Sequence, residues 1–363
     1  MLWRLLTQNV SYLTERKGKM FYFSNKDNPV LTENIFYIIR NARRYIKTGN
    51  FFFKDPKIHE ELLDAAKRGV AIFVLSNLTG NENRGYRNTK IKAEADPHIV
   101  NLHEMEQRGI HVRLCRDLHA KFLIADGEKG LIMSANYTPD SLYENPENGV
   151  DIIGSELTQL EDIFDELYLH PDTILLGDGR QYRYAEKNEP ICAGAFDHID
   201  KSSRLLMTMA SKESSNLREC QYLSIYERII ELINNAQDFI QIVSWSYTDI
   251  ENLPEFVNSL ISASKRGVKI KLYFGTKGEE GRLKRTQKQL ESLNKQLKYQ
   301  ASVLPLEDSH AKCVITDNSA MMFTSNIDGK RGLLSGFELG FVLTEKERQQ
   351  AMIQLKEIEN NGK

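Results

Sequence analysis

The chain contains two histidine–lysine pairs, each with the spacing that a strand needs to present both side chains together. The first pair is His119 and Lys121, the second is His310 and Lys312, and one alanine separates the members of each. In a strand, residues i and i+2 lie on the same face. Imidazole can act as a nucleophile or as a general acid and base, and an ammonium group can neutralise an anionic transition state. The pairs therefore predict chemistry on an anionic group such as a phosphodiester.

The same series of polar residues follows each pair. Both series contain an aspartate, a hydroxyl residue, an asparagine and a glutamate, in that order. They are Asp126, Ser134, Asn136 and Glu147 after the first pair, and Asp317, Thr324, Asn326 and Glu338 after the second. A single His-x-Lys is more often an ordinary strand with a hydrogen-bonded histidine and a lysine that reaches solvent. The repetition of the whole series argues against that interpretation here.

We expect these residues to form one site for phosphodiester cleavage. Two lysine and two asparagine donors would hold the equatorial oxygens of the transition state without a metal or a cofactor. One imidazole would attack phosphorus and form a phosphohistidine, while the other protonates the leaving oxygen and then activates water. Glu147 and Glu338 are each expected to hold the second ring nitrogen of the histidine in their own series. Asp126 and Asp317 have the opposite strand parity, so we expect them to anchor backbone or a lysine.

The chain also repeats outside these motifs. Residues 41–46 resemble residues 235–240, and residues 66–70 resemble residues 264–268. Both matches have nearly the same spacing along the chain as the two histidine motifs. Landmarks in one order at one spacing indicate two related halves.

Each half is expected to alternate helices and strands. Amphipathic spacing predicts helices, and short apolar runs rich in β-branched residues predict buried strands. The expected helices are 34–43, 60–68, 225–235 and 256–266, and the expected strands are 45–53, 70–76, 239–245 and 268–274. This alternation predicts an α/β fold: two pseudo-symmetric halves, each a mixed or parallel sheet flanked by helices, packed face to face. The expected divisions are an N-terminal segment (1–28), the first half (29–175), a linker with some strands (176–222), the second half (223–345) and a charged, solvated C-terminal tail (346–363).

The motifs resemble those of the phospholipase D superfamily, whose signature is H-x-K-x-x-x-x-D followed by G/S-x-N and an acidic residue, twice per active site. Met133 and Ser134 stand where that signature commonly has Gly-Ser. The interval from Asp317 to Asn326 is one residue shorter than its counterpart, so Thr324 rather than Ser325 should match Ser134. The resemblance implies phospholipase D-like halves, with His119 as the nucleophile and His310 as the general acid and base.

Basic segments suggest the substrate. One segment, residues 77–92, follows the strand expected at 70–76, and the other, residues 275–298, follows the strand expected at 268–274. Their basic residues include Arg84, Arg87, Arg282, Lys284, Arg285 and Lys288. Such segments could track a nucleic-acid backbone, although each alone also fits a solvated surface. We therefore expect a metal-independent nuclease acting on DNA or RNA. The alternative is a phospholipase D or phosphatidyltransferase of the cardiolipin-synthase kind; a third reading is a nucleic-acid-binding protein without activity. Apolar residues at the mouth of the site would favour lipid, and an exposed basic groove would favour nucleic acid.

The composition of the chain excludes several other classes of protein. The 363 residues include 48 Lys+Arg and 50 Asp+Glu, so polyanion binding by bulk charge is excluded. Cysteine and histidine spacing does not suggest a metal site, and no apolar run reaches the about 20 residues of a membrane helix. The N-terminus does not read as a signal peptide, so a cytoplasmic location is expected. A regulatory protein partner could hold such an enzyme inactive, and the oligomeric state is open.

Overall fold

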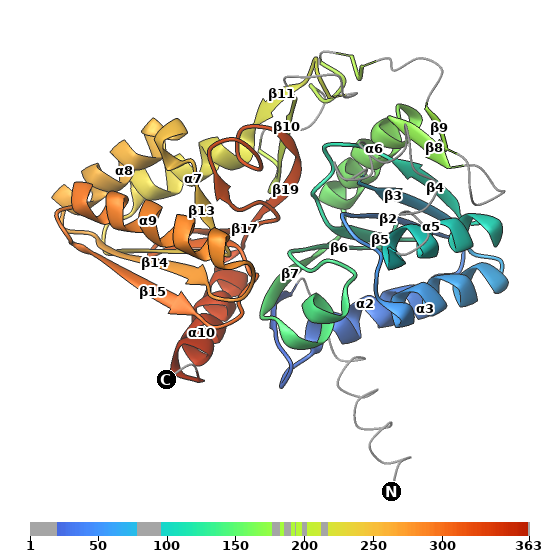
Figure 1. The fold of residues 1–363 in the computed structure, drawn as a ribbon, viewed down its shortest axis with the longest axis horizontal. Coiled ribbons are helices and arrows are strands. Elements are labelled where there is room, and N and C mark those ends of the chain that lie inside the picture. The colour runs from blue at the N-terminus through green and yellow to red at the C-terminus, as the bar shows by residue number, and fades with distance from the viewer. Residues whose placement is uncertain are drawn as a thin grey trace, which may run out of the picture.

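The computed structural model describes residues 20–77, 96–175, 182–184, 190–192, 194–197, 202–211 and 217–361. These residues form two α/β halves that lie side by side, the first blue to green and the second yellow to red in Figure 1. The predicted fold class is confirmed, because each half is a mixed sheet flanked by helices.

The sheet of the first half has nine strands. In spatial order they are β1 (Phe21–Ser24), β7 (Glu147–Ile152), β6 (Lys129–Met133), β5 (Phe122–Ala125), β2 (Tyr45–Asn50), β3 (Ala71–Ser76), β4 (His111–Leu114), β8 (Thr173–Leu175) and β9 (Tyr182–Tyr184). The pairs β2–β3 and β3–β4 are parallel, and the other neighbours are antiparallel. Gly49 on β2 faces the Phe122 ring at the start of β5; an added Cβ would lie 2.3 Å from that ring.

The sheet of the second half has eight strands in a closely matching order. They are β11 (Gln221–Leu223), β10 (Leu205–Ala210), β19 (Gly336–Val342), β17 (Ala320–Phe323), β16 (Cys313–Thr316), β12 (Phe239–Ser244), β14 (Lys269–Gly275) and β15 (Ala301–Leu306). A separate short pair consists of β13 (Tyr247–Thr248) and β18 (Ile327–Asp328). The strands β5 and β16, which follow the two histidine motifs, therefore occupy equivalent central places.

Helices cover both faces of each sheet. The outer faces carry α2 (Val30–Asn41), α3 (Pro56–Lys67) and α5 (Pro97–Gln107) in the first half, and α7 (Ser224–Asn235), α8 (Pro254–Lys265) and α9 (Glu280–Gln296) in the second. Short helical turns η2 (Asp140–Glu144) and η3 (Ile250–Asn252) interrupt the loops. Local signals explain these elements: Asp55, for example, accepts from the Ile58 amide 2.9 Å away, and Pro56 starts α3. None of the helices within these described ranges is long and apolar enough to cross a membrane.

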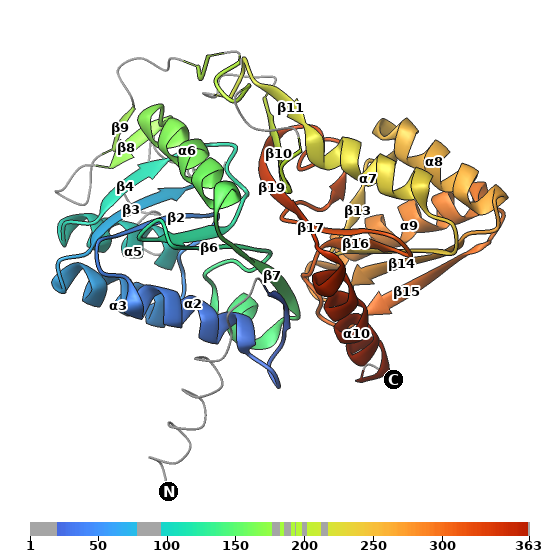
Figure 2. The same ribbon diagram turned by 180° about the vertical axis from the view of Figure 1, so that it is seen from behind.

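The central core lies between the two sheets. It joins the inner faces of both halves with α6 (Ser155–Leu169) and α10 (Glu345–Asn361), which Figures 1 and 2 show near opposite ends of the interface. The C-terminal segment is therefore not the solvated tail that its charge suggested. Ala351 and Leu355 are buried in this core, four residues apart on one helical face, and Glu347 on the same face is buried in an ion pair with Arg204.

Candidate active site

The two histidine motifs meet at the interface between the halves. His119 and Lys121 directly precede β5, and His310 and Lys312 directly precede β16. Both lysine side chains are completely buried. The side chain of His119 is 31% exposed and that of His310 is 15% exposed, so the two imidazoles line one partly open site. The structure thus brings both predicted pairs together.

Each histidine contacts a glutamate of the opposite half. His119 Nδ1 lies 2.6 Å from Glu338 Oε1, and His310 Nδ1 lies 3.3 Å from Glu147 Oε1. The expectation that each glutamate serves the histidine of its own series is wrong. The physical reason is the packing of the halves, which places the start of β19 beside the first motif and the start of β7 beside the second. The short contact lets Glu338 hold the His119 tautomer that leaves Nε2 free for chemistry, whereas the longer contact leaves Glu147 Oε1 without a hydrogen bond among the described residues.

A hydroxyl group donates a hydrogen bond to each glutamate, at the carboxylate oxygen that does not face the histidine. Ser134 Oγ donates to Glu147 Oε2, and Thr324 Oγ1 donates to Glu338 Oε2. The Ser325 hydroxyl is buried without a hydrogen-bond partner in the part of the chain that the structure describes. Thr324 is therefore the structural counterpart of Ser134, as the residue spacing predicted.

The two aspartates lie away from the reacting groups. Asp126 accepts hydrogen bonds from the backbone amides of residues 43–45, at 2.7 to 2.9 Å. Asp317 accepts from the amides of residues 237–239 in the same way, at 3.1 to 3.4 Å. Each aspartate therefore connects the end of a motif strand, β5 or β16, to the start of the neighbouring antiparallel strand, β2 or β12.

The buried lysines keep a low affinity for their protons. Burial lowers the pKa of Lys121 to about 7 and that of Lys312 to about 8, although Glu147 and Glu338 oppose the shift. Each Nζ donates to the backbone carbonyl of the histidine in its own motif. An anionic substrate would raise both pKa values, so the site would gain positive charge when a phosphodiester binds.

The histidines and glutamates have complementary charge states. Burial lowers the pKa of both imidazoles, that of His310 to about 4, against the attraction of the facing carboxylates. Burial alone would raise the pKa values of Glu147 and Glu338, but the histidines and lysines beside them hold both below their ordinary values. Near neutral pH the carboxylates are ionised and the imidazoles are neutral. A neutral imidazole can act as a nucleophile or as a base.

The asparagines of both series have spare hydrogen-bonding capacity. The side-chain oxygens of Asn136 and Asn326 are buried without hydrogen-bond partners in the described residues. Since the oxygen and nitrogen of an amide are assigned from their surroundings, either group can face a ligand. An NH₂ group in this position could donate to a phosphoryl oxygen.

Aromatic side chains flank both histidines, a feature that the histidine motifs do not predict. The Phe51 ring lies 5.1 Å from the His119 ring, and the Trp245 ring lies 5.0 Å from the His310 ring. Both are half-buried, and both follow an equivalent strand, β2 or β12. Their matching positions in the repeat are the signal that could have identified them. We call these two rings, one beside each partly exposed histidine, the aromatic mouth of the site.

The residues of the expected basic rim differ in their surroundings. Arg84 and Arg87 lie outside the described residues. Arg282 is only 6% exposed and donates to the carbonyls of Trp245, Gly275 and Lys277 at 2.6 to 3.1 Å. Its guanidinium also stacks on the Trp245 ring at 4.1 Å. Arg282 thus fixes the position of the Trp245 ring beside His310 and is not free to contact a nucleic acid.

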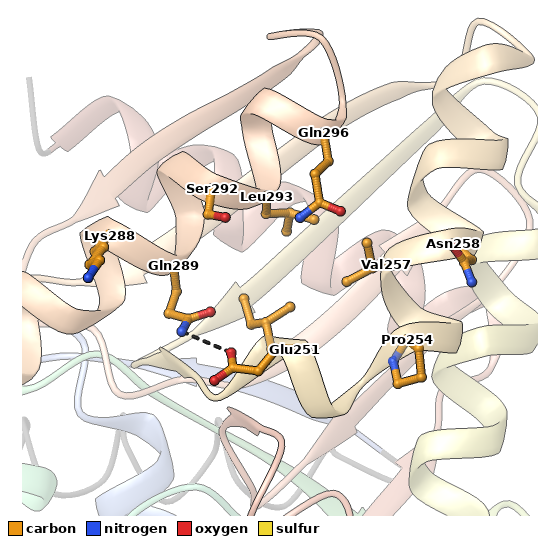
Figure 3. A pocket seen from close by; sticks show the side chains of 10 residues that line it. Glu251, Pro254, Val257, Asn258, Lys288, Gln289, Ser292, Leu293 and Gln296 are labelled. Carbon is orange, nitrogen blue, oxygen red and sulfur yellow. Dashed lines mark hydrogen bonds between the residues drawn. The ribbon is translucent and has the colours of Figure 1, made fainter.

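The other basic residues lie on the exposed face of α9. They are Lys284, Arg285 and Lys288. Lys284 pairs with Glu280 at 2.6 Å, one turn away on the same helix. Lys288 lines a cavity of about 480 Å³ between η3, α8 and α9, where Gln289 and Glu251 form a 3.1 Å hydrogen bond (Figure 3). The residues that line this cavity include none of the histidines, lysines, asparagines and glutamates of the two histidine motif series.

The described residues were also compared with the side-chain groups that hold metal ions in proteins. In those parts of the chain, no three His, Cys, Asp or Glu side chains gather in a way that could hold a metal ion. The positive charges next to the histidines are those of Lys121 and Lys312.

Comparison with known proteins identifies the family. The family described as "Cardiolipin synthase, PLD-like domain" matches the chain twice, over residues 35–168 and 229–358. The structure of phosphatidylserine synthase from Haemophilus influenzae Rd KW20 aligns with a TM-score of 0.64 and 13% identity, over 95% of this chain and 86% of that one. Polyphosphate kinase from Porphyromonas gingivalis aligns with a TM-score of 0.56 and 14% identity, over 94% of this chain and 51% of that one. No curated protein sequence matches the chain.

These matches correct the expected partner. The matching family is named for a lipid-synthesising enzyme, and a nucleic-acid partner is therefore not supported. The inward orientation of Arg282 agrees with this correction. The two structural alignments, at their low identities, show the shared fold. Since the two family matches together cover most of the chain, it belongs to the family described as cardiolipin synthase, PLD-like domain, in the phospholipase D superfamily of phosphodiesterase-type enzymes.

Proposed function

We propose that the chain is a phosphatidyl-transferring or phospholipase D-type enzyme that acts on the phosphodiester of a phospholipid headgroup. The observation that carries this proposal is the aromatic mouth. Phe51 and Trp245 contact the two histidines, and the guanidinium of Arg282 is buried against Trp245. Apolar side chains at the entrance suit a substrate whose diester is attached to hydrocarbon. The family match supports the same substrate class.

The first step divides the work between the two imidazoles. Nε2 of His119 attacks phosphorus in line, a P–N bond forms, and the bond from phosphorus to the headgroup oxygen breaks. His119 is assigned this role because it is the more exposed imidazole and forms the tighter pair with its glutamate. The proton for the leaving alkoxide comes from His310. The anionic diester adds negative charge beside His310 and raises its pKa, so the imidazole can carry that proton.

The second step reverses the first with a different alcohol. His310, now neutral, takes the proton of an acceptor hydroxyl or of water. The oxygen of the acceptor attacks phosphorus, the P–N bond breaks, and His119 is regenerated. An alcohol acceptor gives a new phospholipid, and water gives phosphatidic acid. Lys121, Lys312, Asn136 and Asn326 would hold the oxygens on which charge accumulates in both steps.

A direct test uses defined vesicles. The protein is incubated with phosphatidylglycerol vesicles, and lipid products are separated to distinguish cardiolipin, the transfer product, from phosphatidic acid, the hydrolysis product. Either product should form with the unmodified chain and be absent with His119→Ala. Labelled DNA and RNA are incubated in parallel. Cleavage of an oligonucleotide that depends on His119, with no lipid turnover, would overturn the proposal.

A further inference from the structure

The two junctions between the halves use different hydrogen bonds. At the first motif, the amides of His119 and Ala120 both donate to the Phe337 carbonyl, at 3.0 and 2.9 Å. The Phe337 amide donates in turn to the Asp117 carbonyl at 2.7 Å. Three backbone bonds therefore connect the first motif to the residue just before its partner, Glu338.

The second junction cannot repeat this pattern, because proline occupies the position equivalent to Phe337. Pro146 precedes Glu147 and accepts from the His310 amide at 2.8 Å. Proline has no amide hydrogen to donate, so the counterpart of the Phe337 donor is missing. The Ala311 amide, instead of bonding across the junction, lies 3.4 Å from the Ser309 hydroxyl.

The side chain of Asn148 replaces the missing bonds. Its Nδ2 donates to the Lys312 carbonyl at 2.9 Å, and its Oδ1 accepts from the Lys312 amide at 3.2 Å. The side chain is completely buried. Its counterpart in the other half is Leu339, since Asn148 and Leu339 make the same backbone bonds to Ser134 and Thr324 respectively. A leucine has no polar group for this task, so the feature exists at one junction alone.

We propose that Asn148 is a positioning residue that holds His310 in place for proton transfer. Asn148 binds the backbone of Lys312, while the adjacent Glu147 lies 3.3 Å from the His310 ring. Lys312 Nζ also donates to the His310 carbonyl and lies 3.3 Å from its Nδ1. A shift of β7 against β16 would therefore disturb the ring, its carboxylate and the lysine together. This inference rests on the proposed function, in which His310 protonates the leaving oxygen.

The test compares two leaving groups in Asn148→Leu, which introduces the residue of the other half. Bis(p-nitrophenyl) phosphate releases a phenolate that leaves without a proton, whereas short-chain phosphatidylglycerol releases an alkoxide that needs one. Because His310 also serves the second step on both substrates, the first step is compared through kcat/KM. A misplaced general acid should lower kcat/KM on the alkyl substrate by about 10-fold or more, and on the nitrophenyl substrate by less than about 3-fold. If Asn148→Leu does not fold, as judged by thermal melting, Asn148→Ser is compared in the same way.

The matched control is Arg204→Met. Arg204 also connects the halves, through Glu156 at 3.2 Å and Glu347 at 2.9 Å, but it does not bond to the histidine motifs. Its loss should lower the melting temperature and leave the ratio of the two rates unchanged. Equal losses on both substrates in the Asn148 variants, or the same selective loss in Arg204→Met, would overturn the inference. A wild-type chain that is inactive on the alkyl substrate would instead refute the proposed function.

Discussion

His119 Nδ1 lies 2.6 Å from Oε1 of Glu338, a residue of the other half of the chain. With the reciprocal pair of His310 and Glu147, this contact means that each motif histidine is paired with a glutamate of the other half. The two repeats therefore build one composite site. In the proposed function, each half orients the imidazole of the other.

Removing the charge of Glu338 tests this cross-half pair. Glu338→Gln should lower kcat by about 10- to 100-fold, the usual effect of losing a group that orients an imidazole. It should also lower the pKa of His119, because a neutral amide no longer stabilises the imidazolium. The limb of the pH–rate profile that reports His119 should move to lower pH. In a double-mutant cycle on the free energy of unfolding, Glu338→Gln should couple to His119→Asn more strongly than to His310→Asn; the reverse order would show that the carboxylate serves its own half.

The buried lysines predict how activity depends on pH. Their pKa values of about 7 for Lys121 and about 8 for Lys312 mean that both lose their protons as the pH rises through this range. Because the free enzyme needs the positive charges to bind the diester, kcat/KM should fall on the alkaline side with an apparent pKa of about 7 to 8. Lys312→Met should lower kcat/KM at all pH values. It should also reduce by one the number of ionisations that cause the alkaline decrease of kcat/KM. An unchanged alkaline limb would mean that the lysines stay charged.

The same lysines predict the direction of a stability change. The folded-state pKa of Lys121 lies below its ordinary value of 10.5, so the unfolded chain binds more protons between about pH 7 and 10.5. The contribution of this group to the free energy of unfolding therefore rises with pH across that window and is lowest below it. Relative to the wild type, Lys121→Met should be more stable at pH 6 than at pH 9, as measured by urea unfolding. A difference that does not vary with pH would contradict the lowered pKa.

Asp126 should affect stability rather than chemistry. Its carboxylate accepts three backbone amides and links the end of β5 to the start of β2. Bonds to a charged acceptor contribute about 1.5 to 3 kcal/mol each and are not additive, so Asp126→Ala should cost about 2 to 4 kcal/mol. The backbone φ of 59° at this residue adds to the cost, since alanine adopts that region less readily than aspartate. Denaturant unfolding measures the loss, and kcat per folded molecule should stay within about 2-fold of the wild type.

The sequence predicted the elements and the members of the site because both depend on local patterns. The helix expected at 225–235 is α7, and the strand expected at 268–274 is β14, since periodicity and glycine ends are local signals. The pairing of Glu338 with His119 could not be predicted, because the repeat places a glutamate in each half and does not say how the halves pack. The role of Arg282 was missed for a related reason. Its charge suggests a surface, whereas the three carbonyls that bury it come together only in the fold.

The aromatic mouth predicts a difference between lipid and small substrates. Phe51→Ala and Trp245→Ala remove the rings that lie 5.1 and 5.0 Å from the two histidines, so each should raise KM for phospholipid vesicles by about 10-fold. Hydrolysis of bis(p-nitrophenyl) phosphate should change by less than about 3-fold in Phe51→Ala, since the reacting groups remain. Lys284→Glu is the matched surface control, because this exposed residue pairs only with Glu280 on α9 among the ion pairs of the described chain. It should leave both activities unchanged; a loss of lipid turnover in Lys284→Glu, with none in the aromatic variants, would place substrate recognition on α9 instead of at the mouth.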